Sequence, residues 1–301
     1  VMLSSRVVKT RGAPGRFEAT ISQAGAETTE NVGAIVVATG WRPYDATRLT
    51  HLGYGAPDVV TGVEFEQMLR EGGPKRRSNG APVKAIAFLQ CAGSRDAAHL
   101  PYCSSVCCGV SIKQALQVVT ADPQAIAYVI YEELRTPGTA EEFYREAQRN
   151  GVIFMKGRIR RVDGQAMTVA YEDELLGSEV PLGGLDLIVL ATGMVPNSTD
   201  IDAPAVEPEK SAAQLSADIN PLSPIPVAGY KGEAPAASSP GPQPALPPGG
   251  PILNLQYRQG PHIPILADGF ADSHYICFPY ETRRTGIYTC GPVRRPMDMA
   301  E

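Results

Sequence analysis

The sequence predicts an α/β protein with a parallel sheet at its core. In the middle of the chain, apolar runs typical of buried strands alternate with segments of helical spacing, which is the order of a dinucleotide-binding domain. In addition, the nine residues Ile35–Pro43 (IVVATGWRP) return 153 residues later as Ile188–Pro196 (IVLATGMVP), with six of nine positions identical. Each copy is an apolar run followed by a small-residue turn, so the sequence predicts an internal repeat of two strand ends.

Short strands are expected before each copy of the repeat. Arg6–Thr10, Phe17–Ser22 and Ala34–Ala38 are β-type runs separated by Gly, Pro and polar turns, and they predict a meander. Similar pieces precede the second copy, so the same arrangement is expected there. These pieces are Arg158–Val162, Met167–Tyr171 and Leu185–Leu190.

The segment between the two copies is expected to form the parallel sheet and its helices. Ser104–Val119 has apolar residues at helical spacing, and Ala140–Asn150 predicts a second helix that ends before Gly151. Three apolar runs alternate with these helices and predict buried strands. The runs are Val83–Leu89, Ala125–Tyr131 and Val152–Met155.

Composition divides the chain into parts. Residues 201–250 contain 11 Pro and 10 Ala with few aromatic residues, which favours an extended linker over a packed unit. From Tyr257 onward, aromatic residues and arginines return, up to the strand-like run Gly286–Thr289, so this segment is expected to pack on the body. The expected domains are residues 1–76, 77–197, the linker 198–251 and the C-terminal segment 252–301.

Charge and hydropathy exclude several classes of protein. The 301 residues carry 32 acidic and 27 basic side chains, a formal net charge of −5, so no basic footprint predicts nucleic-acid binding. The longest apolar stretches are about seven residues, whereas a bilayer crossing needs roughly 20. Because the N-terminus lacks the apolar core and cleavage site of a secretory signal, a reducing cytoplasm is expected, where six cysteines need an explanation other than disulfides.

Four of the six cysteines fall within 18 residues: Cys91, Cys103, Cys107 and Cys108. Thiolates gathered in a reducing compartment usually hold a metal, because four like charges need a cation to coexist. Zinc favours CxxC-like pairs, which this spacing lacks, and adjacent cysteines chelate one small ion awkwardly. A cubane offers four separate irons, so neighbouring cysteines can reach different corners. Zinc, or cysteines that are simply buried apolar residues, are the alternatives.

The position of these cysteines adds a second argument. Cys91 directly follows the strand Val83–Gln90, where a nucleotide-binding domain begins its glycine-rich phosphate turn, and no GxGxxG fingerprint occurs in the chain. Cys107 and Cys108 lie near the start of the next helix, whose positive end favours thiolates as it favours a pyrophosphate. We infer that a cluster replaces the pyridine nucleotide here.

The remaining cysteines and the histidines are given no certain role. Cys277 and Cys290 have no ligand-like neighbours and are interpreted as small apolar residues. The four histidines are scattered, and none is arranged with a nucleophile and an acid. His99 lies in the loop between cysteines, where a hydrogen bond to a cluster sulfur is the alternative to a plain loop position.

At the cysteines, the sequence resembles a known family. The segments FLQCAGSRD (Phe88–Asp96), YCSSVCC (Tyr102–Cys108) and IKQA (Ile112–Ala115) are similar to the A subunit of heterodisulfide reductase. The resemblance implies a thioredoxin-reductase-like flavoprotein fold with two dinucleotide-binding domains and a cluster-binding insertion. The [4Fe-4S] ligands that it implies are Cys91, Cys103, Cys107 and Cys108.

The second cofactor that the resemblance implies is FAD. The Ala-Thr-Gly turn after the meander would run beside the flavin nucleotide, and Tyr288–Asp298 would approach the flavin ring. Residues 1–76 and 252–301 would belong to the FAD domain and 77–197 to an NAD(P)-domain-like unit, with the family's first strand and GxGxxG turn missing before the meander. The implied contact residues are Ala38, Thr39, Gly40, Gly291, Arg294 and Asp298.

The C-terminal segment resembles a more specific group of related proteins. FADS (Phe270–Ser273) and FPYETRRTGIY (Phe278–Tyr288) are similar to the B subunit of the quinone-interacting membrane-bound oxidoreductase of sulfur-metabolising bacteria. This implies an oxidoreductase subunit that relays electrons between a [4Fe-4S] cluster and FAD in a complex. Adenylylsulfate reductase is one candidate partner. The other is a membrane quinone-reactive subunit, through which the cytoplasmic chain would reach the membrane.

Two other functions stay open at this point. One is a metal-stabilised structural or docking module without a redox role. The other is a thiol-disulfide oxidoreductase that uses the adjacent Cys107 and Cys108, although the absence of a CxxC pair argues against it.

Overall fold

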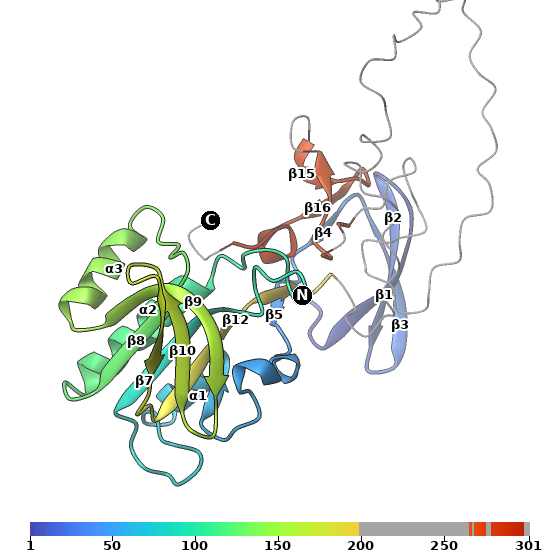
Figure 1. The fold of residues 1–301 in the computed structure, drawn as a ribbon. Helices are drawn as coiled ribbons and strands as arrows, with labels where there is room; N and C mark the ends of the chain where they lie inside the picture. Colours follow the sequence, from blue (N-terminus) through green and yellow to red (C-terminus); the bar gives the residue numbers. More distant parts are fainter. Residues whose placement is uncertain (199–264, 267, 275–277, 298–301) are drawn as a thin grey trace, which may run out of the picture. The chain divides into compact units, whose positions relative to one another are not determined.

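The computed structural model describes residues 1–198, 265, 266, 268–274 and 278–297 (Figure 1). The chain divides into two compact units. Unit 1 comprises Val1–Ile35 and Ser198–Tyr288, and unit 2 comprises Val36–Asn197 and Thr289–Glu301. Almost all of the expected linker, together with Cys277 and Asp298, lies outside the described residues. Within the described part, no helix has both the length and the apolar character that a membrane crossing needs.

Unit 1 contains two antiparallel groups of strands. The first is a three-stranded sheet of β1 (Ser5–Ala13), β2 (Arg16–Gln23) and β3 (Ala26–Val32). The first two strands were predicted, and they are confirmed. The polar β3 was not predicted, because AETTENV lacks apolar alternation and only its pairing with β2 makes it a strand. The second group contains β14 (Ser273–His274), β15 (Phe278–Thr282) and β16 (Ile287–Thr289).

Unit 2 is built on a seven-stranded sheet in the order β11-β10-β9-β8-β7-β12-β6. The five strands from β9 to β6 in this order pair in parallel, and β10 and β11 add an antiparallel edge. The prediction of an α/β fold with a parallel sheet is therefore confirmed. The strands are β6 (Val59–Thr61), β7 (Ala85–Ala92), β8 (Ile126–Tyr131), β9 (Ile153–Asp163), β10 (Thr168–Asp173), β11 (Ser178–Leu182) and β12 (Leu187–Thr192).

Helices cover one face of this sheet. They are α1 (Gly62–Arg70), α2 (Cys107–Ala121) and α3 (Ala140–Arg149). Their apolar side chains share a buried cluster with Ile86 and Phe88 of β7. The unpredicted α1 begins with a capping box, in which Glu64 N donates to Thr61 Oγ1 at 3.2 Å and Thr61 N donates to Glu64 Oε2 at 2.7 Å. The helix expected from Ser104 begins three residues later, at Cys107.

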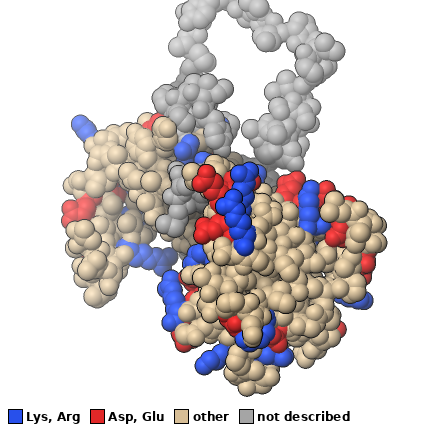
Figure 2. All heavy atoms as spheres, turned by 90° about the vertical axis from the view of Figure 1, so that its left-hand side faces the viewer, with Lys and Arg blue, Asp and Glu red and all other residues tan. Residues whose placement is uncertain are grey.

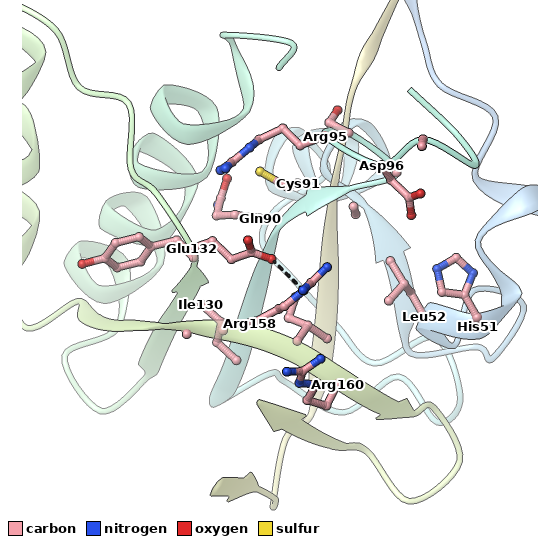
Figure 3. Close-up of a pocket in the computed structure, with 17 residues that line it drawn as sticks. His51, Leu52, Gln90, Cys91, Arg95, Asp96, Ile130, Glu132, Arg158 and Arg160 are labelled. Atoms are coloured by element: carbon pink, nitrogen blue, oxygen red, sulfur yellow. Dashed lines mark ion pairs between the residues drawn. The ribbon is translucent and has the colours of Figure 1, made fainter. Parts of the chain in front are cut away.

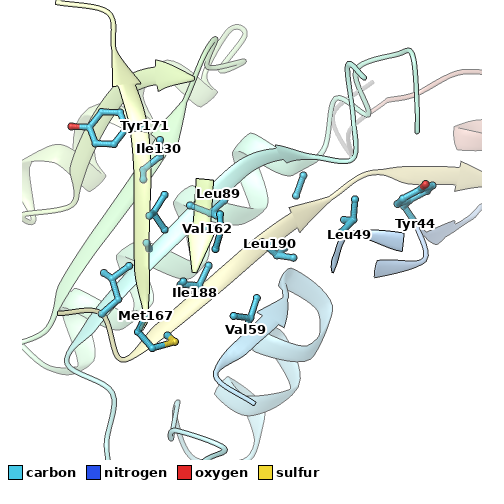
Figure 4. Close-up of a cluster of buried hydrophobic side chains, with 14 of the residues drawn as sticks. Tyr44, Leu49, Val59, Leu89, Ile130, Val162, Met167, Tyr171, Ile188 and Leu190 are labelled. Carbon is cyan, nitrogen blue, oxygen red and sulfur yellow. The ribbon is translucent and has the colours of Figure 1, made fainter. Parts of the chain in front are cut away.

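The other face of the sheet is covered by its own antiparallel edge. Figure 4 shows Val162, Met167 and Tyr171 from the β9–β10 hairpin packed over the central strands. The two strands expected at Val152–Met155 and Arg158–Val162 are one continuous strand, β9, which corrects the prediction. Gly157, which lies between the two expected strands, pairs with Asp173 of β10 so closely that a Cβ would come within 2.7 Å of the Tyr171 ring. A glycine is needed there for close approach rather than for a turn.

The two copies of the repeat pair with each other. The end of the first copy forms β5 (Trp41–Pro43), and the end of the second forms β13 (Met194–Pro196). They are antiparallel, with Val195 opposite Arg42. Asn197 N also donates to Gly40 O at 3.0 Å. The strand before the first copy's turn is β4 (Ile35–Val37), and β12 takes this place in the second copy.

A buried carboxylate, directly before β6, is hydrogen-bonded to the loop between α1 and β7. Asp58 is 3% exposed and accepts hydrogen bonds from the backbone and hydroxyl of Ser78, at 3.1 and 2.6 Å, and from the Arg76 guanidinium. Burial alone would raise the pKa of Asp58, but the hydrogen bonds from Ser78 and Arg76 outweigh it and lower the pKa. Stability from this group is therefore present above the ordinary aspartate pKa of about 3.9 and is lost as the pH falls through the lowered value.

Asp58→Ala is expected to lower the free energy of unfolding at pH 7 by about 3 kcal/mol, because it leaves buried donors without their acceptor. Denaturant titrations of the full chain would show this deficit shrinking below pH 3 to 4. The control is Asp122→Ala, which removes an exposed ion pair with Lys84 and should cost much less stability. A deficit at Asp58 that is the same at low pH would contradict the charge-based explanation.

Charged side chains of both signs are interspersed on the face shown in Figure 2. In unit 2, many of them form exposed ion pairs, such as Arg95–Glu133 at 3.4 Å, Lys156–Glu174 at 2.8 Å and Arg158–Glu132 at 3.5 Å. Such pairs contribute little stability individually. They leave no large field of a single sign on this face.

Candidate metal centre

The four clustered cysteines line one small cavity in unit 2, of about 40 Å³. Cys91 lies near the end of β7, and Cys103 lies in the loop that follows. Cys107 and Cys108 are the first two residues of α2. A cavity of this size exceeds what one water molecule needs. The structure thus brings together all four residues that the sequence singled out, and their role as metal ligands stays a prediction.

The cavity lies at the point where the strand order of the sheet reverses. From β7 the chain crosses to β8 and then β9 on one side, whereas β12 pairs with β7 on the other side. The Cys107 thiol donates to the carbonyl of Thr192, the last residue of β12, at 3.5 Å. Open α/β sheets bind their ligands in the crevice at the carboxyl ends of two strands that diverge in this way. The cysteines therefore occupy the position of a ligand site.

Two serines anchor the cysteine loop to the second copy of the repeat. The hydroxyls of Ser94 and Ser104 lie 3.0 Å apart, and Met194 N donates to Ser104 Oγ at 3.0 Å. Both serines are at least 96% buried. The Tyr102 hydroxyl also donates to Met194 O at 2.8 Å. Because Ser94 follows Cys91 by three residues and Ser104 follows Cys103 directly, these bonds position the backbone around both cysteines.

The backbone around the cavity is strained. Cys91, Arg95 and Ser105 have φ angles of 56°, 58° and 61°, in the left-handed region that favours glycine. Among the described residues, six non-glycine residues have positive φ, and half of them lie in this short segment. Each costs about 1 kcal/mol or more, and such strain gathers at functional sites where the surroundings enforce it.

Burial makes negative charge on these sulfurs costly. Burial raises the pKa of Cys91 to about 11, and repulsion from Cys108 adds to the effect. Burial and repulsion from the other cysteines also raise the pKa of Cys107, and burial raises that of Cys108. Reactive thiols have a lowered pKa instead, so this environment disfavours a thiol-disulfide oxidoreductase using Cys107 and Cys108. Deprotonation of several of these cysteines needs added positive charge, which a metal centre supplies.

Hydrogen-bond donors surround the sulfurs. Ser105 N donates to Cys103 Sγ at 3.4 Å. Arg95 and Arg135 also border the cysteine cavity, and their positive charges oppose the rise in the pKa of Cys91 and Cys108. In addition, α2 begins at the cysteines without a side-chain cap, so its positive end faces them. These groups favour thiolate ligands and would tune the potential of a bound cluster.

Zinc and an iron-sulfur cluster make different demands on the four cysteines. Tetrahedral zinc with Zn–S bonds of about 2.3 Å places its four sulfurs about 3.8 Å apart. Within the described residues, no three His, Cys, Asp or Glu side chains form a group of the kind that holds a single ion. The four cysteines border a cavity instead, as a centre with several separate irons requires. An all-cysteine donor set suits either centre, and the spacing of these cysteines, which lacks a CxxC pair, favours the cluster.

A larger cavity of about 460 Å³ adjoins the cysteine cavity, and both are bordered by Cys91, Ser94 and Arg95. Figure 3 shows Arg158 and Arg160 of β9 on a wall away from Cys91, with Arg158 paired to Glu132. One side of the cysteine cavity therefore borders a larger cavity.

His99 does not border the cysteine cavity. Its Nδ1 lies 2.8 Å from the Tyr44 hydroxyl, and the His51 ring stacks on its own ring with 5.2 Å between centroids. Of the two interpretations of His99, the structure supports the loop position, which this hydrogen bond stabilises.

The residues expected near FAD lie in two segments that meet. Ala38, Thr39 and Gly40 follow β4, and Gly291 and Arg294 lie in and directly after the 3-10 turn Gly291–Val293. Cys290 N donates to Val37 O at 3.0 Å, which joins the two segments. Asp298 lies outside the described residues. The role of these residues in binding FAD stays a prediction.

Several residues of the candidate site were not identified from the sequence. Ser94, Arg95 and Ser104 lie inside or next to the cysteine motifs, and attention to polar residues in those motifs would have found them. Arg135 lies in the loop after β8, and Asn197, whose Nδ2 donates to Thr39 O at 2.9 Å, follows β13. Nothing local marks these two, since only the fold brings them to the site.

No protein-family model matches the chain. The A subunit of the H(2)/formate:CoB-CoM heterodisulfide,ferredoxin reductase of Methanococcus maripaludis is 38% identical over 181 residues, 56% of this chain and 27% of that protein. The iron-sulfur A subunit of the CoB-CoM heterodisulfide reductase of Methanocaldococcus jannaschii is 38% identical over 178 residues, 55% of this chain and 27% of that protein. The chain thus spans about a quarter of the length of these relatives.

Among solved structures, thioredoxin reductase from T. acidophilum has 12% sequence identity and a TM-score of 0.43, covering 99% of this chain and 67% of that one. The fold assignment rests on the strand order of unit 2 rather than on this likeness. The part of the chain that these relatives match is similar to heterodisulfide reductase A subunits.

Proposed function

We propose that this chain is an electron-transfer subunit that holds a [4Fe-4S] cluster and passes electrons between it and FAD within a multi-subunit oxidoreductase. The proposed cluster ligands are Cys91, Cys103, Cys107 and Cys108. One observation carries the proposal: all four line a single cavity at the point where open α/β sheets bind ligands. The names of the relatives, which are iron-sulfur and ferredoxin reductase subunits, agree with it.

Each group around the cavity has a part in this proposal. A bound [4Fe-4S] cluster supplies one-electron transfer at a potential set by charge, hydrogen bonds and burial. The cysteines hold it, and Arg95 and Arg135, with the N–H group of Ser105, stabilise negative charge on their sulfurs. Ser94 and Ser104 hold the loop in position through their hydrogen bonds.

FAD is the proposed second cofactor. The support is the meeting of the Ala38–Gly40 turn with the Gly291–Arg294 turn through the Cys290–Val37 hydrogen bond. The exposed Ala38 and Thr39 leave this turn open to a ligand. Gly291 has a φ of 73°, which allows a tight backbone turn at that point.

The proposed partners are other members of a redox complex. The C-terminal strings FADS and FPYETRRTGIY support a likeness to the B subunit of the quinone-interacting oxidoreductase. On that basis we propose adenylylsulfate reductase and a quinone-reactive membrane subunit as candidate partners. The chain itself would work in the cytoplasm and reach a membrane only through such a membrane partner.

Analysis of the protein purified without oxygen tests the proposal. The expected result is a brown protein with about four iron and four sulfide per chain, which takes up electrons in a reductive titration. Flavin released by acid would be counted separately, so that FAD binding is judged on its own. A colourless protein with one zinc per chain would reject the cluster. Bound iron without electron uptake would favour the docking module instead.

A further inference from the structure

Gln90 is a buried side chain whose polar atoms have no partner. It is 4% exposed, and neither Oε1 nor Nε2 makes a hydrogen bond. Each of these atoms also exposes less than 1 Å² to solvent, so water in the neighbouring 460 Å³ cavity does not reach them. A buried amide left in this state costs roughly 1–3 kcal/mol, and proteins rarely tolerate it without a reason.

The alternation of β7 places Gln90 on the helical face of the sheet. Ile86 and Phe88 point to the helical face, where they pack with α2, and Ala87 and Leu89 point to the opposite face. Gln90 follows Phe88 by two residues and therefore points to the helical face, at the carboxyl end of the strand. There α2 begins, with Cys108 and Ser111 among its buried residues.

The close-up of the larger cavity agrees with this direction. Figure 3 shows the Gln90 side chain at the end of the cavity that holds Cys91 and Arg95, away from Arg160. Gln90 borders the larger cavity rather than the cysteine cavity itself, and it directly precedes Cys91 in the chain. A buried N–H donor at this position suits a metal centre, since cluster sulfurs accept N–H hydrogen bonds.

We propose that the Gln90 amide donates a hydrogen bond to a sulfur of the metal centre and raises its reduction potential. The inference rests on the proposed function, because it needs the cluster to be present. The reduced cluster carries one more negative charge than the oxidised one, and a hydrogen-bond donor stabilises the more negative state more strongly. Removing the donor therefore shifts the potential to more negative values.

The test is Gln90→Leu in the full chain, which keeps the shape of the side chain and removes the amide. The expected result is normal iron content with a more negative midpoint potential in a redox titration followed by EPR. Proton ENDOR of the reduced cluster in H₂O and D₂O should also lose one exchangeable proton coupling. In the cluster-free full chain, the same variant should raise the midpoint denaturant concentration, because a buried amide without partners is replaced by an apolar group.

The control is Gln114→Leu, a second buried glutamine of unit 2. Its Nε2 donates to Gly62 O at 2.9 Å and to Glu66 Oε2 at 3.0 Å, so its role is structural. This variant should lower stability and leave the potential and the proton couplings unchanged. If Gln90→Leu retains its iron with an unchanged potential and unchanged couplings, the inference is wrong while the proposed function stands. If the wild-type protein binds no iron, the proposed function itself fails.

Discussion

Cys107→Ala is expected to remove nearly all iron and sulfide from the protein. Cys107 opens α2, and its thiol is held at the carbonyl of Thr192, so no other residue of the cavity takes its place when the sulfur is removed. Three cysteines leave one iron of a cube without its protein ligand, and the raised pKa values of Cys91 and Cys108 show how costly unpaired thiolates are there. Iron and sulfide analysis, with the visible spectrum, measures the loss.

Cys290→Ala is the matched control for this experiment. Cys290 belongs to the same unit but is exposed and does not border the cysteine cavity. It should keep the wild-type iron, sulfide and colour. If Cys107→Ala keeps a full complement of iron, Cys107 is not a ligand and the assignment of the four cysteines has to be revised. Equal loss in both variants would point to general damage instead.

Local patterns were enough to predict the candidate site. The cysteine spacing is contained in one short segment, and the strand before it and the helix after it have clear apolar periodicity. A site formed between a strand end and the next helix is a local feature, so the sequence contains what is needed to find it. The same holds for the parallel strands β7 and β8, whose runs are continuous and apolar.

Other features depend on contacts between distant residues. A glycine often marks a turn, yet β9 continues through Gly157 because β10 pairs closely with it there. Arg135 lies far from Cys108 in the sequence, yet both residues border the cysteine cavity. Periodicity describes the neighbours of a residue in the chain and not its neighbours across a sheet, so neither feature was predictable.

One position of the repeat also shows that the sequence pattern does not report contacts between distant residues. Gly40 and Gly193 occupy the same place in the two copies, and the sequence treats them alike. Gly40 has a φ of 70° and open space around it, so it is needed for its backbone conformation. Gly193 has no such φ, but a Cβ there would lie far inside contact distance of the Ser94 and Ser104 hydroxyls and 2.7 Å from Leu100 Cδ1. Glycine is needed at position 193 because only a residue without a Cβ fits against these side chains.

Gly193→Ala is therefore expected to disturb the cysteine loop. The added methyl group overlaps the buried Ser94–Ser104 pair, which holds the loop to the backbone of Met194. Overpacking of this kind costs about 1–3 kcal/mol, and more where the obstructing groups are hydrogen-bonded and cannot move. We expect a lower free energy of unfolding in denaturant titrations and a loss of bound iron, since Ser94 lies three residues after Cys91 and Ser104 directly follows Cys103.

Gly109→Ala provides a control with the opposite expected sign. Gly109 follows Cys108 in α2, and a Cβ at this position meets nothing within 4 Å. Alanine should stabilise the helix by up to about 1 kcal/mol and leave the iron content unchanged. The two substitutions add the same methyl group near the same cysteines, so a difference between them reports the packing around Gly193. If both variants keep their iron and their stability, the serine pair does not position the cysteines, and the loop must be held by the strained backbone at Cys91 and Ser105 alone.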